Sequence, residues 1–138
     1  TPEGFDAGAL LDRFEQFYQE SEEILPAAAQ ALDECRLGDF GRLVDRSQAL
    51  AERLLGNQVP ETIALAHSAR DLGAVAASAF GAGFGGSVWA LVPSAAASAF
   101  TESWQRAYRA ACPGPAGAAR FLFTRPGPGA FRLPVETP

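Results

Sequence analysis

The stretch Ala76–Val92, AASAFGAGFGGSVWALV, decides the fold of this chain. Its four glycines, Gly81, Gly83, Gly85 and Gly86, lie within six positions, between two apolar runs that each indicate a buried strand. A glycine in an ordered element costs about 0.5–1 kcal/mol relative to alanine, so four cost about 2–4 kcal/mol. A plain hairpin turn needs about one or two such residues. The stretch therefore predicts a strand–loop–strand unit in which the exposed glycine backbone serves a role beyond forming the turn.

Helical periodicity dominates the chain before this hairpin. The apolar spacing predicts helices over about 6–70, the first of them capped by Asp6. Gly38 is expected to stop one helix, and Asp39 to cap the next. Pro60 suits the first turn of the last helix in this series, because its missing N–H has no partner there anyway.

The pattern changes after these helices. We expect the glycine-loop hairpin over about 74–92, a helix over about 95–111 and a closing hairpin over about 119–133. The strands of the closing hairpin are expected at 120–124 and 130–133. Helices followed by hairpins predict a single α+β domain, with its helices packed on one face of a small four-stranded antiparallel sheet.

Composition excludes several classes of function. The 138 residues carry a net charge of −5 and contain no lysine, which argues against nonspecific binding of nucleic acid. The two cysteines, Cys35 and Cys112, are too few for a zinc site and are expected to be free thiols. No apolar run suits a membrane span and no signal-peptide pattern is present, so we expect a cytoplasmic protein. Because the chain starts at Thr1, we expect a processed chain or a piece of a larger one.

The glycines satisfy two familiar phosphate-binding patterns. GAGFGG fits the dinucleotide pattern G-x-G-x-x-G, but that pattern needs a following helix, and here the strand SVWALV follows. The protein-kinase pattern G-x-G-x-x-G-x-V is also satisfied, but a protein kinase and a Walker A loop both require a lysine. Two interpretations remain: a loop whose amides approach an anionic ligand or another loop, and a purely structural hairpin.

Other chemistry-bearing residues have structural interpretations. His67 lies beside Ser68 with Asp71 four residues on, but the side chains of a catalytic triad do not adjoin along one helix, so a surface or half-buried structural histidine is expected. The acids at 20–23 indicate a solvated helix face. Aromatic residues recur at helical spacing in the helix after the hairpin, which favours core packing: Phe100, Trp104 and Tyr108.

Four segments of the sequence resemble the GHMP small-molecule kinases, and most closely the galactokinases. ASAFGAGFGGSVWALV at 77–92 resembles the third conserved motif of that family. LGDFGRLVDRSQ at 37–48 resembles the segment that precedes the motif, and VPETIAL at 59–65 resembles a V-S-x-P-E-L-D segment. FLFTRPGPGAF at 121–131 resembles the closing hairpin. The resemblance covers most of residues 33–133.

The resemblance implies a ferredoxin-like C-terminal domain of a sugar kinase that phosphorylates a sugar hydroxyl with Mg·ATP. It places the P-x-x-x-G-L-S-S-S motif, the catalytic carboxylate and its arginine in an N-terminal half that these 138 residues do not contain. ATP and Mg²⁺ would be bound mainly there, and that N-terminal kinase domain would be the partner of this chain. It implies no catalytic residue and no metal ligand in this chain. The loop beside nucleotide and substrate would consist of Gly81, Ala82, Gly83, Phe84, Gly85, Gly86 and Ser87.

The sequence departs from the galactokinase pattern at several positions. Ser78 stands where arginine is usual, Phe80 where a hydroxyl residue is usual, Ser87 where cysteine is usual and Gln48 where histidine is common. The final acid of the V-S-x-P-E-L-D segment, which follows P-E-L, is also absent, since the chain reads PETIAL there. Two alternatives therefore stay open beside the sugar kinase: a non-catalytic paralogue that senses sugar, and an independent helical interaction domain.

Overall fold

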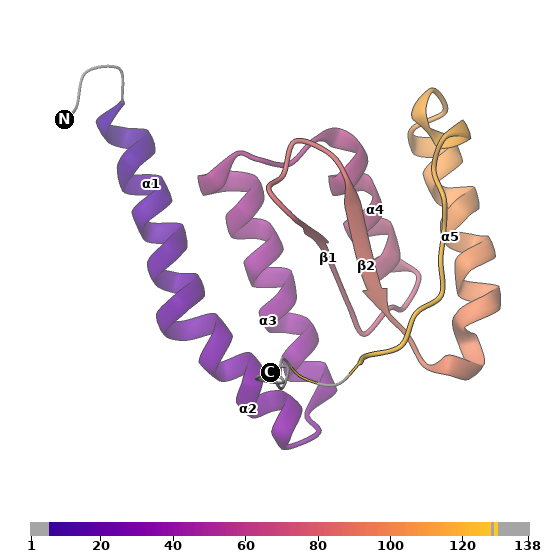
Figure 1. Ribbon diagram of the computed structural model, residues 1–138, viewed down its shortest axis with the longest axis horizontal. Coiled ribbons are helices and arrows are strands. Elements are labelled where there is room, and N and C mark those ends of the chain that lie inside the picture. Colours follow the sequence, from indigo (N-terminus) through magenta and orange to yellow (C-terminus); the bar gives the residue numbers. More distant parts are fainter. Residues whose placement is uncertain (1–5, 128, 130–138) are drawn as a thin grey trace, which may run out of the picture.

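A long helix opens the described part of the chain, which comprises residues 6–127 and 129 of a computed structural model (Figure 1). Helix α1 spans Ala7–Tyr18. The Asp6 carboxylate accepts a hydrogen bond from the Ala9 amide at 2.8 Å, which satisfies one of the free N–H groups at the helix start. The predicted cap at Asp6 is confirmed.

The helix does not break at Pro26. It continues through a π-helical segment, η1 at Gln19–Ile24, directly into α2 at Leu25–Asp33. Pro26 lies in the first turn of α2, and the widened turns of η1 come just before it. In a regular helix the proline ring would press on the carbonyl four residues earlier, so a widened segment at this place accommodates it.

The predicted boundary at Gly38 and Asp39 is wrong. Helix α3 spans Leu37–Leu50, so both residues lie inside its first turn. A short turn precedes it, and the Arg36 guanidinium pairs there with the carboxylates of Glu34 and Asp39. Helix α2 is terminated by the left-handed Cys35, with φ of +56°, where the Arg36 amide donates back to the Ala31 carbonyl at 2.7 Å. The chain therefore reverses before Gly38.

Helix α3 runs into a second π-helical segment, η2 at Ala51–Leu55. It ends at Gly56, whose φ of +62° is in the left-handed region that favours glycine. Helix α4 then spans Pro60–Asp71, and Pro60 occupies the predicted position in its first turn.

The glycine-loop hairpin forms as expected. Strand β1, Ala76–Phe80, pairs antiparallel with β2, Ser87–Leu91, in a register that runs from Ala76 opposite Leu91 to Phe80 opposite Ser87. Helices α3 and α4 both contact β1, and α4 also contacts β2. The hairpin is thus carried on these two helices (Figure 1).

After the hairpin, a 3₁₀ turn at Ser94–Ala96 leads into α5 at Ala97–Ala111, and a second 3₁₀ turn lies at Pro115–Gly117. The predicted third strand at 120–124 is wrong, because this segment has no strand pairing and runs beside α5 (Figure 1). The predicted strand at 130–133 lies outside the described residues. Within residues 6–127 and 129, the sheet therefore has two strands rather than four.

Aromatic packing explains why residues 120–124 follow α5. The Phe121 ring lies edge-on to Trp104, with 5.1 Å between centroids, and also contacts the ring of Tyr108 at 6.4 Å. By contrast, Leu122 is 86% exposed and Phe123 67% exposed. One ring therefore attaches the segment to the aromatic face of α5.

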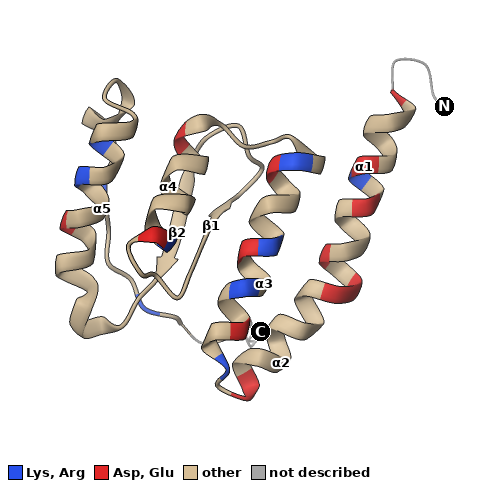
Figure 2. Ribbon diagram, turned by 180° about the vertical axis from the view of Figure 1, so that it is seen from behind, with Lys and Arg blue, Asp and Glu red and all other residues tan. Residues whose placement is uncertain are grey.

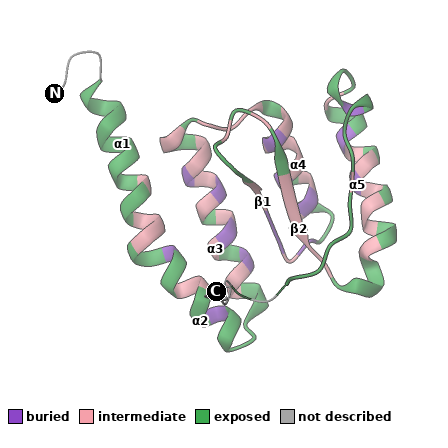
Figure 3. Cartoon of the chain, viewed as in Figure 1, coloured by how far each residue is buried: buried purple, intermediate pink, exposed green. Residues whose placement is uncertain are grey.

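The core lies between α4, the hairpin and α5. Buried small residues, Ala69, Ala74 and Ala77, surround Trp104, whose indole N–H donates to the Leu65 carbonyl at 2.9 Å. Figure 3 shows the buried positions on α3, α4, β1 and α5, whereas α1 has no buried position. The predicted core role of the aromatic face of α5 is confirmed, and burial raises the pKa of its tyrosine, Tyr108.

Candidate functional site

The glycine loop between β1 and β2 has an almost continuous left-handed backbone. The φ angles are +97° at Gly81, +90° at Gly83, +115° at Gly85 and +104° at Gly86. Residues with a Cβ avoid this region at a cost of about 1–2 kcal/mol each. Phe84, with φ of +58°, is the loop residue that adopts it despite a side chain. The backbone conformation therefore accounts for all four glycines.

Asn57, just beyond the end of η2, contacts the tip of this loop. Its backbone carbonyl accepts a hydrogen bond from the Phe84 amide at 2.5 Å, and its side-chain amide donates to the Ala82 carbonyl at 3.3 Å. A Cβ on Gly83 would lie only 2.4 Å from the Asn57 carbonyl oxygen. The loop thus lies directly against the asparagine, and Gly83 is required for that close approach.

Other groups of the loop are exposed or have no hydrogen-bond partner among the described residues. No acceptor within residues 6–127 and 129 bonds to the amides of Ala82, Gly83 or Gly85. Phe84 is 78% exposed, and Phe80, at the end of β1, is 58% exposed. Free backbone amides in a left-handed loop can bind an anionic group, and exposed rings can contact an apolar surface. The predicted residues Gly81–Ser87 form this loop and the first position of β2.

The hairpin carries no charge of its own. No Asp, Glu, Lys or Arg occurs between positions 72 and 101, and Figure 2 shows β1, the loop and β2 free of both charge colours. The red positions gather on α1 and on η1, which continues it (Figure 2). Any attraction of the loop for an anion must therefore come from backbone amides, and full charges must be supplied by other groups.

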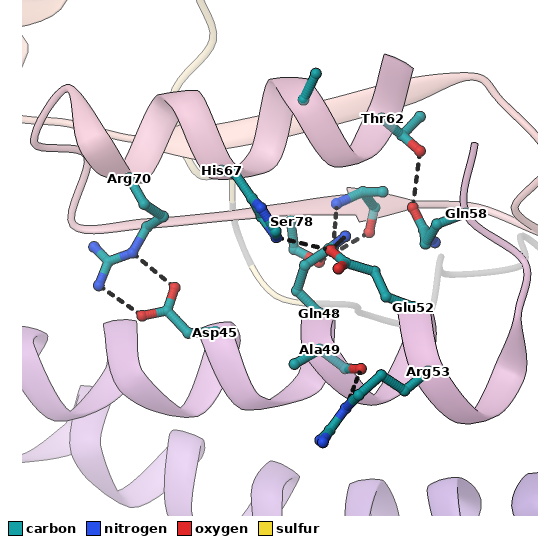
Figure 4. Close-up of polar contacts among 12 residues, drawn as sticks. Asp45, Gln48, Ala49, Glu52, Arg53, Gln58, Thr62, His67, Arg70 and Ser78 are labelled. Atoms are coloured by element: carbon teal, nitrogen blue, oxygen red, sulfur yellow. Dashed lines mark hydrogen bonds and ion pairs between the residues drawn. The ribbon is translucent and has the colours of Figure 1, made fainter. Parts of the chain in front are cut away.

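Gln48 connects α3 to the stem of the hairpin, by which we mean the paired strands β1 and β2. Its side-chain oxygen accepts hydrogen bonds from the Ser78 hydroxyl and the Ala79 amide, both at 2.9 Å, and its amide donates to Glu52 at 2.9 Å (Figure 4). The Glu52 carboxylate also lies 3.0 Å from the ring nitrogen Nε2 of His67. Gln48 is only 4% exposed, so this amide is a buried link between helix and strand.

His67 takes no part in a catalytic triad. It is largely exposed and contacts Glu52, whereas the Ser68 hydroxyl donates to the Ala64 carbonyl at 2.5 Å. The prediction of a surface histidine is confirmed.

Arg70 connects α3 to the residues that lead into β1. Its guanidinium bonds both carboxylate oxygens of Asp45, at 2.7 and 2.8 Å (Figure 4). It also donates to the carbonyls of Ala74 and Val75. Asp45 and Arg70 line a groove of about 510 Å³ between α3 and α4. Since these charged groups are engaged with each other and with the backbone, their role in the described structure is to join α3, α4 and β1.

Replacing Gln48 by alanine tests the link to the stem. The Ala79 amide and the Ser78 hydroxyl would both lose their acceptor, and we expect a loss of about 1–3 kcal/mol in unfolding free energy. Urea denaturation measures this change. Gln30→Ala is the matched control, because Gln30 is exposed and bonds only the exposed Glu34 in the described chain, and a change within about 0.5 kcal/mol is expected. Equal losses in the two variants would contradict the link.

Asn57 and Glu52 are the site residues that sequence reasoning missed. Asn57 is recognisable from sequence only as part of the Gly-Asn pair that ends a helix. Nothing in the spacing of the sequence indicates that this helix end lies under a loop 25 residues later. Glu52 bonds Gln48 within its own helix, but it meets His67 of α4 only through tertiary packing.

None of the described helices has the length and apolarity required to cross a membrane. Within residues 6–127 and 129, no three His, Cys, Asp or Glu side chains gather in a metal-binding cluster. Mg²⁺ at a phosphate site takes only about one or two carboxylates from the protein, and the glycine loop at 81–87 contains none.

Fold and site together define an α+β domain that presents a glycine loop, with free amides, from a hairpin supported by two helices. Residues 28–110 match the family model described as GHMP kinases C terminal. The match covers more than half of the chain and includes α3, α4, both strands and the glycine loop. The chain belongs to this family of kinase C-terminal domains. Neither the curated proteins nor the solved structures that were compared gave a match.

Proposed function

We propose that this chain is the C-terminal half of an ATP-dependent sugar kinase similar to the galactokinases. The observation that carries the proposal is the glycine loop, whose amides at Ala82, Gly83 and Gly85 have no acceptor among the described residues. Phosphoryl transfer requires positioning of the phosphates and neutralisation of their charge. In the proposed enzyme, these amides would hold phosphate oxygens and the loop would close one side of the substrate site.

The uncharged hairpin defines what the loop contributes. Between positions 72 and 101 there is no carboxylate to act as a base and no cation to neutralise a phosphate. ATP supplies the phosphoryl group and Mg²⁺ would neutralise its charge when bound, with both held mainly by the N-terminal half. This chain orients the phosphates and excludes water from the transfer site.

An exposed apolar face supports the N-terminal kinase domain as the partner of this chain. Helix α1 has no buried residue, yet it carries large apolar side chains that include Leu11 at 68%, Phe14 at 64% and Phe17 at 65% exposure. Contiguous exposed apolar side chains of this kind mark interaction sites. We infer that the N-terminal half of the same protein covers this face of α1.

Phosphorylation assays on two lengths of the protein test the proposal. The full-length protein is incubated with Mg·ATP and a panel of hexoses and pentoses, and ADP release is measured against reactions without sugar. We expect sugar-dependent ADP release by the full-length protein and none by the 138-residue chain, because the hairpin lacks the charged groups that the reaction needs.

Each other outcome has a defined meaning. Sugar phosphorylation by the 138-residue chain alone would contradict the division of labour between the two halves. Sugar binding by the full-length protein without ADP release would favour the non-catalytic sensing paralogue. Failure to bind either sugar or ATP, with tight binding of a protein partner, would favour an independent interaction domain.

A further inference from the structure

We propose that Asn57 is a positioning residue that holds the glycine loop in the conformation its ligand requires. The inference rests on the proposed function in one respect, the use of the loop amides to hold phosphate oxygens. The hold itself is a property of the described chain, which can be measured without any ligand.

Two hydrogen bonds attach the loop to Asn57. The Phe84 amide donates to the Asn57 carbonyl at 2.5 Å, and the Asn57 side chain donates to the Ala82 carbonyl at 3.3 Å. One N–H and one C=O of the loop are thereby committed to the asparagine, and the amides of Ala82, Gly83 and Gly85 are not. Asn57 thus separates the loop groups that attach it to the domain from those that stay free.

Steric fit reinforces these bonds. A Cβ on Gly83 would lie 2.4 Å from the backbone oxygen of Asn57 and 2.6 Å from its Cβ. Gly81 has nearly the same left-handed φ, +97° against +90°, but a Cβ there would meet no atom within 4 Å. An alanine at either position would therefore suffer the same backbone strain, but only an alanine at position 83 would also collide with Asn57.

The same helix holds the other end of the hairpin. Gln48, in α3, bonds Ser78 and Ala79 in the stem, while Asn57 follows directly on the η2 continuation of that helix and bonds the tip. A loop attached at its stem to α3 and at its tip to the turn that follows the same helix loses little freedom when a ligand binds. Such preorganisation raises affinity without new contacts to the ligand.

Amide hydrogen exchange in the 138-residue chain tests the hold. We expect exchange at the Phe84 amide to become about tenfold faster in Gly83→Ala, equivalent to about 1.4 kcal/mol. Asn57→Ala keeps the backbone carbonyl, so about a threefold increase is expected from the loss of one hydrogen bond. Gly81→Ala supplies the same strain without the contact to Asn57, and its effect should be clearly smaller than that of Gly83→Ala. Equal acceleration in the two glycine variants, with none in Asn57→Ala, would overturn the proposal.

Steady-state kinetics of the full-length protein test the consequence for the reaction. With a sugar accepted in the assays above, Asn57→Ala should raise the KM for ATP about threefold, and Gly83→Ala about tenfold. Simple destabilisation would lower the amount of active enzyme and leave KM unchanged, so an unchanged KM in both variants would overturn the positioning role. If the full-length protein phosphorylates no sugar, the proposed function fails, whereas the exchange result still decides whether Asn57 holds the loop.

Discussion

Replacing Trp104 by alanine is expected to cost about 3–5 kcal/mol of unfolding free energy. The indole is only 8% exposed, packs among the buried alanines and donates to the Leu65 carbonyl of α4 at 2.9 Å. Phe121 rests edge-on against it at 5.1 Å, so the segment beside α5 would lose its main attachment as well. Against a typical domain stability of about 5–15 kcal/mol, the variant would be close to unfolding.

Urea denaturation followed by circular dichroism measures this loss. Trp104→Phe is the matched control, because it keeps an aromatic ring in the core and removes the indole N–H, and a smaller loss of about 1–2 kcal/mol is expected. Equal losses in the two variants would mean that the hydrogen bond to Leu65 outweighs packing. A loss below about 1 kcal/mol for the alanine variant would show that Trp104 is not a core residue.

Replacing Gly41 by alanine is expected to destabilise the protein by about 3 kcal/mol, at the upper end of the range for overpacking. Gly41 is buried in α3, and a Cβ there would lie 2.1 Å from the backbone oxygen of Val75, at the entrance to β1. A backbone atom cannot rotate away as a side chain can. Helix α3 and the strand would therefore have to separate.

The same helix provides the control. A Cβ at Gly38 would have the Arg42 side chain as its nearest neighbour, at 3.9 Å, so Gly38→Ala should be neutral or stabilise α3 by about 0.5 kcal/mol. Paired urea denaturation curves measure both variants. A stabilising effect of alanine at both positions would contradict the close approach of α3 to the strand.

Gly41 also affects the candidate site. Its missing side chain lets α3 approach β1, and the same helix carries Gln48 to the stem of the hairpin and leads on to Asn57 at the loop tip. We therefore expect Gly41→Ala, which separates α3 from β1, to weaken the attachments of the glycine loop to both Gln48 and Asn57. Amide hydrogen exchange at Phe84, measured on the folded Gly41→Ala variant without urea, tests this effect.

Local sequence signals predicted the elements whose ends depend on nearby residues. Asp6 and Pro60 mark helix starts through their own side-chain or backbone chemistry, and the structure places them there. The hairpin was predictable for the same reason, since four glycines between two apolar runs leave few other conformations. The strand prediction at 120–124 was wrong because an apolar pattern shows that one face of a segment is buried but does not identify the neighbour that buries it.

The amino-acid sequence by itself determined the hairpin, the need for bare backbone in its loop and the helices on either side. It also indicated membership of the GHMP kinases, which the family match to their C-terminal domain confirms. All of these depend on conformational preferences and spacing within short segments. Only the tertiary structure decided that Asn57 lies under Gly83, that Gln48 holds the stem and that Phe121 packs on Trp104. These contacts join residues between 17 and 31 positions apart, and such pairs meet only when the elements that carry them have packed together.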